Sequence, residues 1–283
     1  MKVVFWGTRG SLAAPGPETV RYGGNTACVE VCVASDHVVV LDAGTGIRRL
    51  GATLGPEVRR VDLLLTHLHM DHIVGLGFFD ALYQTEREVH IWGPGSTTQD
   101  LGSRLSRYLS PPLFPVRVRD LDCVLRLHDV PLGEFELPDL VVRSALVTHP
   151  GPTVGYRLEH ADGTVTYLTD HEPALGDAGF PSAPEWTSGF DLAYRADVLI
   201  HDAMFDDAQY ADRQGWGHSA ISHALAFAAL TEVRQLVTFH HDPAHDDETL
   251  DRLYATARAA DLPFELTVAS EGLEIDVLSA RIR

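Results

Sequence analysis

The chain has 283 residues, enough for one large or two ordinary domains, and its 45% hydrophobic and 22% charged residues are typical of a globular protein with a sizeable core. No apolar run approaches the roughly 20 residues that span a bilayer, and the N-terminus lacks the apolar core of a signal peptide, so we expect a cytoplasmic protein without a membrane partner. The formal net charge of −18 disfavours a long nucleic acid as partner and favours a small substrate.

The first half of the chain alternates β-rich runs with turns that contain Gly, Pro or Asp. Two further stretches read as helical: one has leucines at helical spacing, and the other is compatible with a helix but interrupted by glycines. We predict strands at 2–7, 26–33, 37–44, 61–67 and 87–93, and helices at 73–84 and 99–109. The three cysteines are odd in number and form no CxxC pair, so we expect free thiols rather than disulfides.

The second half continues the alternation of strands and helices. Here β-rich runs, a short turn and two apolar-periodic stretches are visible. We predict strands within 123–147, a hairpin of 154–160 and 164–170, a strand at 196–205, a helix at 219–233, a strand at 235–241, a helix at 246–261 capped by Asp246 or Asp247, and strands within 264–278. No linker divides the chain, so residues 1–283 are predicted to form one domain of sheets packed face to face with helices outside.

The strongest local signal follows the predicted strand at 61–67. His67 and His69 project to the same side if the backbone stays extended, and Asp71 and His72 follow where the chain turns toward a helix. Four such side chains at the end of a hydrophobic strand would be costly to desolvate without a partner. Imidazole and carboxylate together suit zinc or another first-row divalent ion. The alternative, a polar loop that happens to be rich in histidine, is disfavoured.

This HxHxDH string resembles the signature of the metallo-β-lactamase superfamily. Further landmarks of that superfamily follow in order at the ends of predicted strands, at His149, Asp170 and His240. The resemblance covers nearly the whole chain and implies an αββα sandwich of two mixed sheets. It also implies two divalent metal ions, for which zinc is favoured while manganese or iron would suit the same ligands.

The resemblance further implies how these ligands are shared. One metal would be held by His67, His69 and His149, and the second by Asp71, His72 and His240. Asp170 would bridge the two metals, with a hydroxide between them. Two neighbouring ions lower the pKa of a shared water and make hydroxide available near neutral pH, and Asp71 would also orient that hydroxide.

Two ligand positions have alternatives next to them in sequence. His241 directly follows His240, and Glu172 lies two residues after Asp170. Because neighbouring side chains of a strand point to opposite faces, we expect His240 rather than His241 to be the ligand, and Asp170 is favoured over Glu172. Asp42 is expected to orient a metal-bound histidine rather than to bind a metal itself.

The N-terminal segments at 5–11 and 21–26 resemble the opening of the branch that contains ribonuclease Z and small cyclic-phosphate phosphodiesterases. Two later segments, at 201–205 and 217–219, are similar to motifs of ribonuclease Z, the first with Asp in place of Glu and Met in place of Thr. The resemblance implies that His218 would protonate the leaving oxygen or stabilise phosphoryl charge, while Asp202 orients its ring. The alternative is that His218 faces solvent beside a helix capped by Ser219 or Ser222.

The proline-rich segment at 108–115 resembles a rim loop of the small phosphodiesterases. Its prolines make it stiff. Phe114 would either stack on a base or sugar of the substrate or cover an edge of the core, and the sequence leaves both open.

We therefore predict a metal-dependent hydrolase that acts on a small phosphodiester, cyclic or linear. A lactonase or β-lactamase-like hydrolase on the same metals is the alternative, and it predicts no phosphate-directed role for His218. A tRNA 3′-end endonuclease is disfavoured by the net charge and by the lack of a basic, glycine-rich arm. A metal-stabilised binding module would leave a complete hydrolytic site unused. A homodimer is the base-rate expectation for the oligomeric state.

Overall fold

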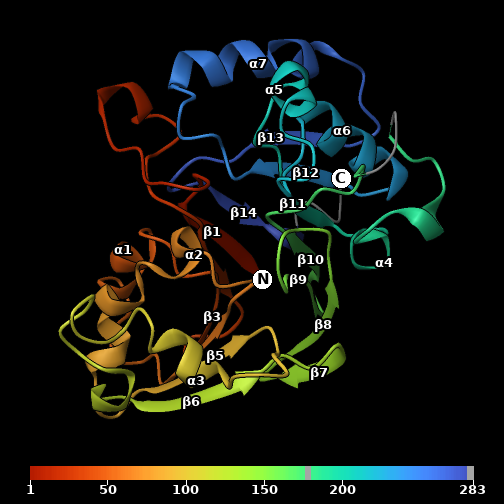
Figure 1. The fold of residues 1–283 in the computed structure, drawn as a ribbon. Coiled ribbons are helices and arrows are strands. Elements are labelled where there is room, and N and C mark those ends of the chain that lie inside the picture. The colour runs from red at the N-terminus through yellow and green to blue at the C-terminus, as the bar shows by residue number, and fades with distance from the viewer. Residues whose placement is uncertain (176–179, 279–283) are drawn as a thin grey trace.

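Two seven-stranded sheets pack face to face in the computed structural model, which describes residues 1–175 and 180–278 (Figure 1). Helices cover the outer face of each sheet. This is the αββα arrangement of mixed sheets that the sequence predicted.

The first sheet has the strand order β14-β1-β2-β3-β4-β5-β6. Its strands are β1 (Lys2–Gly7), β2 (Cys28–Cys32), β3 (His37–Leu41), β4 (Arg60–Leu64), β5 (Glu88–Gly93), β6 (Val124–Asp129) and β14 (Glu274–Asp276). Pairing is antiparallel from β14 to β3 and parallel from β3 to β6.

The second sheet repeats this pattern with the order β13-β12-β11-β10-β9-β8-β7. Its strands are β7 (Gly133–Leu137), β8 (Leu140–Leu146), β9 (Val154–His160), β10 (Gly163–Leu168), β11 (Val198–Asp202), β12 (Gln235–Phe239) and β13 (Glu265–Val268). Pairing is antiparallel from β7 to β10 and parallel from β10 to β13. The predicted hairpin is confirmed, since β9 and β10 pair from the turn outward.

Alternating side chains of the strands fill two separate layers of the core. In β3, Val39 and Leu41 point into the layer between the sheets, while Val38 and Val40 point to the layer beneath the helices. Because the strand is buried on both faces, its sequence is apolar from Val38 to Leu41. A third layer lies between the second sheet and its helices, where Phe227 and Tyr254 are fully buried.

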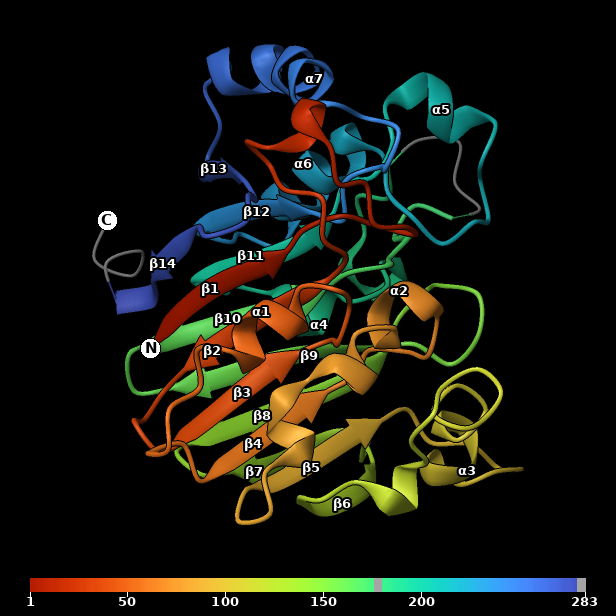
Figure 2. The same cartoon turned by 90° about the vertical axis from the view of Figure 1, so that its left-hand side faces the viewer.

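Short helices cover both outer faces. On the first sheet lie α1 (Ile47–Gly51), α2 (Met70–Ile73) and α3 (Leu101–Leu105) (Figure 2). The second sheet is covered by α4 (Phe190–Ala193), α6 (Ile221–Leu230) and α7 (Asp247–Ala259), with α5 (Asp207–Ala211) nearby. Single 3-10 turns are η1 (Pro17–Thr19), η2 (Leu76–Phe78), η3 (Asp80–Tyr83), η4 (Val118–Asp120) and η5 (Pro184–Trp186).

In the part of the chain that the structure describes, no helix has both the length and the apolar character that a membrane span requires.

The prediction of one helix over 73–84 is wrong, because α2 ends at Ile73 and only the 3-10 turns η2 and η3 follow. The backbone of Gly75 lies against the Ala43–Gly44 turn and donates to the carbonyl of Ala43 at 2.9 Å. A Cβ at Gly75 would lie 2.1 Å from the carbonyl oxygen of Gly44, so this close approach requires glycine. Of the two N-cap candidates of α7, Asp246 is the cap and accepts from the Thr249 amide at 2.7 Å.

Candidate metal centre

The seven predicted metal ligands lie together at the carboxyl ends of strands from both sheets. Because parallel strands of a sheet end at the same edge, residues far apart in sequence meet there. The positions are His67 and His69 after β4, Asp71 and His72 in α2, His149 after β8, Asp170 after β10 and His240 after β12. Their nitrogen and oxygen atoms form two sets, and within each set the atoms lie within 4.8 Å of one another.

The first set joins three histidines and Asp170. The Nδ1 atom of His69 lies 3.2 Å from the Nε2 atom of His149. The Oδ2 atom of Asp170 lies 3.6 Å from Nε2 of His67 and 3.9 Å from Nε2 of His149. The Nε2 atom of His67 is buried without a hydrogen-bond partner among the described residues. This set opens outward, since His69 is exposed and His149 half-buried.

The second set is fully buried and uses the other oxygen of Asp170. The Oδ1 atom of Asp170 lies 3.0 Å from Nε2 of His72 and 3.1 Å from Nε2 of His240. These two nitrogens lie 3.3 Å apart, and Oδ2 of Asp71 lies 3.2 and 3.3 Å from them. The two oxygens of one carboxylate thus face different groups of nitrogens.

The donor atoms of both sets fit divalent metal ions. Nitrogens of different histidines face one another, so two protons on them would clash while two lone pairs would suit a cation between them. Burial lowers the pKa of His67, His69 and His149, which favours the neutral imidazole that binds metals. Nitrogen and carboxylate ligands in this number are those of zinc and related ions.

A layer of hydrogen bonds orients these side chains. The Nδ1–H group of His72 donates to Asp42 at 2.8 Å, which leaves Nε2 of His72 free to face the second set. Asp42 also accepts from the Thr66 amide at 2.8 Å and from the Tyr167 hydroxyl at 3.0 Å. The position of Asp42 is thus the one expected for a residue that orients a ligand.

Three non-glycine residues at the centre adopt left-handed backbone conformations. Their φ angles are +59° for Asp42, +49° for Asp170 and +61° for His240. Such angles cost free energy for residues with a Cβ and persist where the surrounding structure holds them. All three lie one or two residues after the end of a strand, and their side chains reach the centre, a feature that the sequence pattern did not indicate.

His218 and Asp202 lie beside the two sets. The Nδ1–H group of His218 donates to Asp202 at 2.7 Å, and the His218 ring stacks on that of His240 with centroids 5.1 Å apart. Burial would lower the pKa of His218, but the charge of Asp202 outweighs it and raises the pKa to about 9. The alternative of a solvent-facing His218 beside a serine-capped helix is wrong, because His218 is 9% exposed and α6 begins after Ala220 without a side-chain cap.

The sequence matches the Beta-lactamase superfamily domain over residues 37–241. The chain belongs to the β-lactamase superfamily. As a member of this superfamily it is a hydrolase, and its fold implies divalent metal ions. Among curated relatives, the ribonuclease Z of Haloarcula marismortui is 26% identical over 92% of this chain and 79% of that protein. The ribonuclease Z of Bradyrhizobium diazoefficiens is 29% identical over 80% and 89%, respectively.

Solved structures of the superfamily share the fold over the whole chain. The metallo-β-lactamase fold protein YhfI from Bacillus subtilis has a TM-score of 0.69 at 16% identity and covers 97% of this chain and 98% of its own. The short form of human tRNase Z has a TM-score of 0.66 at 22% identity and covers 98% and 99%. A diphosphatase from the PhnP family has a TM-score of 0.68 at 17% identity and covers 97% of both chains.

In this superfamily member, the neighbours of the predicted ligands point elsewhere. The Nε2 atom of His241 lies 2.9 Å from the carbonyl oxygen of Ala269. His171, which follows Asp170, pairs with His201 at 2.9 Å in the core behind the centre. The preference for His240 over His241 therefore agrees with the geometry.

Glu172, the alternative to Asp170 as a metal ligand, does not occupy a ligand position. It lies outside both ligand sets and is buried, accepting from the amides of Gly215 and Gly217 at 2.8 Å each and from the Tyr210 hydroxyl at 3.0 Å. The Gly217 carbonyl in turn accepts from Nδ1–H of His149 at 2.9 Å. Glu172 thereby fixes the loop that orients His149, a role set by contacts between distant residues.

Arg9 is a second residue whose place the sequence did not indicate. It is fully buried, and its guanidinium donates to the carbonyls of Gly23 at 2.7 Å and Asp242 at 3.2 Å. These contacts hold the segment after β1 against the loop that follows His240. In the same segment, the Ser11 amide donates to Asp71 at 2.7 Å. The N-terminal segment at 5–11 thus supports the second ligand set.

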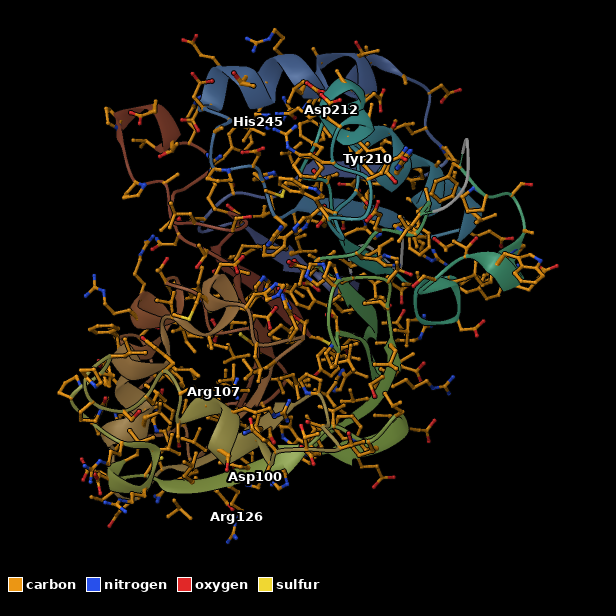
Figure 3. All side chains as sticks on the ribbon, in the orientation of Figure 1. Asp100, Arg107, Arg126, Tyr210, Asp212 and His245 are labelled. Carbon is orange, nitrogen blue, oxygen red and sulfur yellow. The ribbon has the colours of Figure 1, made fainter. Side chains whose placement is uncertain are left out.

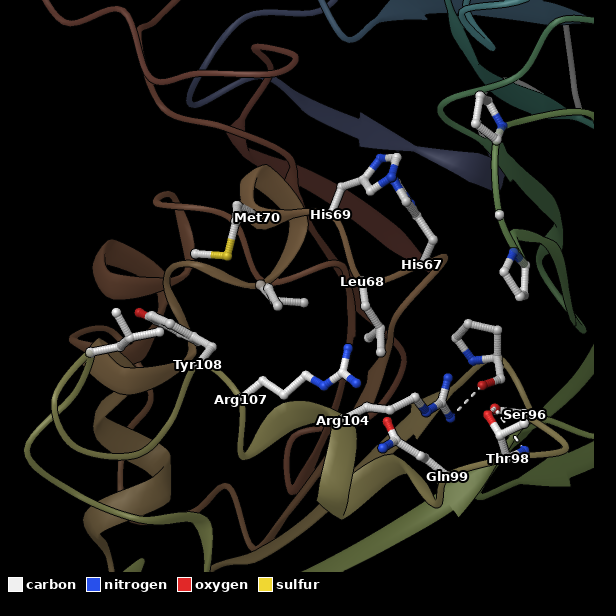
Figure 4. A pocket seen from close by; sticks show the side chains of 16 residues that line it. His67, Leu68, His69, Met70, Ser96, Thr98, Gln99, Arg104, Arg107 and Tyr108 are labelled. Atoms are coloured by element: carbon white, nitrogen blue, oxygen red, sulfur yellow. Dashed lines mark hydrogen bonds between the residues drawn. The ribbon is translucent and has the colours of Figure 1, made fainter.

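A cavity of about 740 Å³ adjoins the first ligand set (Figure 4). His67 and His69 form one end, and Arg104, Arg107 and Tyr108 line the opposite side.

The 108–115 segment forms part of this cavity wall. Phe114 is buried and packs against Phe78 and Tyr108, with ring centroids 5.6 and 6.0 Å apart. Of the two alternatives for Phe114, covering an edge of the core is therefore the one that the structure favours. Leu113, which is 70% exposed, lines the cavity instead.

Proposed function

We propose that this protein is a binuclear metal-dependent phosphodiesterase that acts on a small phosphodiester, linear or cyclic. The observation that carries the proposal is the division of the Asp170 carboxylate between two sets of donor atoms, with His218 beside them. His67, His69 and His149 would hold one ion, and Asp71, His72 and His240 the second. Zinc is the ion that this histidine-rich set favours, and manganese or iron would use the same ligands.

Two bound ions supply a hydroxide near neutral pH and stabilise negative charge on substrate oxygens. The remaining chemistry falls to side chains of this chain. Asp202 fixes the ring of His218 by accepting from Nδ1–H, so the Nε2 atom of His218 is the one that serves the substrate. A proton held at this nitrogen would pass to the leaving oxygen of the diester. Asp71, anchored by the Ser11 amide, would orient the attacking group.

An RNA endonuclease is the second candidate, and it is favoured by the name ribonuclease Z of the curated relatives. The charge of the chain favours the small substrate instead. With a formal net charge of −18, the protein repels a long polyanion. The cavity beside the first ligand set also has the volume of a small-molecule site.

The test is a substrate panel with the metal-loaded protein: bis(p-nitrophenyl) phosphate, cyclic nucleotides, a precursor tRNA, a lactone and a chromogenic β-lactam. We expect turnover of small phosphodiesters. His218→Ala should lower kcat by roughly 10²- to 10⁴-fold, the usual contribution of a positioned acid or base, while metal content measured by elemental analysis persists.

His223→Ala is the matched control, because His223 lies in α6 outside the ligand sets. It should retain nearly the full rate. Turnover of the lactone or the β-lactam alone would overturn the proposal. Cleavage of precursor tRNA without turnover of small diesters would favour the second candidate.

A further inference from the structure

The cavity beside the first ligand set has a charge opposite to that of the chain as a whole. Its lining contains Arg104 and Arg107 and no Asp or Glu, although the chain carries 40 acidic and 22 basic residues. A cluster of positive charge in a strongly acidic protein attracts an anion to that place.

Arg104 is held in position from one side only. One of its terminal nitrogens donates to the Pro94 carbonyl at 2.7 Å and lies 3.4 Å from Asp129, a residue outside the cavity lining. Its side chain is 13% exposed, and its Nε atom is buried without a hydrogen-bond partner among the described residues. A guanidinium fixed in this way loses little entropy when it binds a ligand.

Arg107 lies one helical turn beyond Arg104 and is exposed. Its side chain forms no ion pair or hydrogen bond within the part of the chain that the structure describes. Figure 4 shows the Arg107 guanidinium extending toward Leu68 and the Arg104 guanidinium extending toward Ser96, both on the side of the cavity away from His69. Ser96 and Thr98 line the same end and add hydroxyl groups.

Much of the remaining cavity wall is apolar. Met70, Ile73, Leu113 and Pro152 line it together with the ring of Tyr108. Such a wall suits the carbon skeleton of a sugar or a base, whereas the arginine end suits an oxyanion with several acceptor oxygens.

We propose that Arg104 and Arg107 form a subsite for a terminal phosphate that the substrate carries in addition to its scissile phosphodiester. This inference rests on the proposed function and specifies its substrate class. The diester lies at the histidine end of the cavity, the skeleton of the substrate lies along the apolar wall, and the second phosphate accepts hydrogen bonds from the two guanidinium groups.

A matched pair of substrates tests the subsite. Thymidine 5′-(p-nitrophenyl phosphate) and its 3′-phosphorylated form differ only by one phosphomonoester. With the metal-loaded protein, we expect a kcat/KM at least about tenfold higher for the phosphorylated substrate. Arg107→Gln and Arg104→Gln should each remove most of this preference, and Arg107→Lys should keep part of it because it retains the charge.

Arg126→Gln is the matched control. Figure 3 shows Arg126 on β6 at the outer edge of the molecule, pointing away from it, and it pairs there with Glu88. The control removes the same charge and should leave the preference for the phosphorylated substrate intact. A wild-type ratio near one, or equal loss in Arg126→Gln and Arg107→Gln, would overturn the subsite even if both diesters are cleaved.

Calorimetric titration separates failure of the subsite from failure of the proposed function. Thymidine 3′,5′-bisphosphate should bind the metal-loaded protein at least about tenfold more tightly than thymidine 5′-monophosphate, and Arg107→Gln should abolish the difference. If neither diester is turned over, the proposed function fails, and this difference in Kd still decides the subsite. Equal Kd values for the two nucleotides would overturn it.

Discussion

Two groups of histidine and aspartate adjoin β4 and differ in how their polar atoms are paired. We call the seven predicted ligands, which meet where β4 and strands of the second sheet end, the strand-end cluster. In it the side-chain nitrogens of five histidines face one another and the two oxygens of Asp170. Five residues before His67, Asp62 is the centre of a second group, the Asp62 network. It accepts from Nε2–H of His37 at 2.8 Å, Nε–H of Arg60 at 2.6 Å and Nε1–H of Trp92 at 2.8 Å.

The difference shows what distinguishes a metal site from a structural network. In the Asp62 network every contact joins a donor to an acceptor, so the charge is compensated by the protein itself. In the strand-end cluster, imidazole nitrogens face other imidazole nitrogens at 3.2 and 3.3 Å, so at most one nitrogen of each pair can carry a proton. Burial of histidine and aspartate alone therefore does not indicate a metal, whereas convergence of unpaired lone pairs does.

Substitution of aspartate by asparagine at three positions tests this difference between the two groups. Asp170→Asn should have the largest effect, because the amide can offer only one acceptor oxygen to two sets of nitrogens. We expect loss of bound metal in elemental analysis and a fall in kcat of at least roughly a thousandfold. Retention of two ions at nearly full activity would show that Asp170 does not join the two sets.

Asp42→Asn should have an intermediate effect, because Asp42 is paired like the Asp62 network but acts on a ligand. Its amide would no longer accept well from Nδ1–H of His72 while it also serves Thr66 and Tyr167. We expect metal affinity, measured by competition with a chelator, to fall by about 10- to 100-fold. Unchanged affinity together with lower thermal stability would assign Asp42 a purely structural role.

Asp62→Asn should change stability without changing metal content or activity. Burial alone would raise the pKa of Asp62, but hydrogen bonds from His37, Arg60 and Trp92 outweigh it and hold the pKa well below its usual range. Because this carboxyl has a lower pKa in the folded than in the unfolded chain, its contribution is complete above the ordinary value of about 3.9 and is lost as the pH falls below it.

Denaturant unfolding at several pH values checks this expectation. The variant should lose about 2 kcal/mol of unfolding free energy near pH 7, and the gap between wild type and variant should narrow as the pH falls below about 4. A gap that stays constant over this range, or a loss of bound metal, would contradict the assignment of the Asp62 network to structure alone.

The local sequence predicted the strands and the grouping of the candidate ligands, because both depend on short-range patterns. Alternation within β3 and the string that begins at His67 are readable without knowledge of distant contacts. The order of landmarks at His149, Asp170 and His240 then agreed with the superfamily to which the chain belongs.

The parts that the sequence missed depend on contacts between distant segments. The helix predicted over 73–84 is broken because the Gly75 backbone lies against the Ala43–Gly44 turn. His218 follows the loop that Glu172 holds through the Gly217 amide, and Asp170 and His240 adopt positive φ angles near the ends of their strands. The sequence did not indicate a role for Arg104 and Arg107, because the cavity that they line forms only in the folded chain.

The mirrored arrangement of the two sheets has a consequence for how the protein matures. Each sheet contributes some of the candidate ligands. The segment after β4 contributes four of the seven, and the segments after β8, β10 and β12 contribute the other three. A nascent chain synthesised only as far as β6 carries four of the seven candidate ligands and lacks the other three. Both metal ions would therefore bind last, after the two sheets have met. Their binding would raise the free energy of unfolding by an amount that grows with the metal affinity.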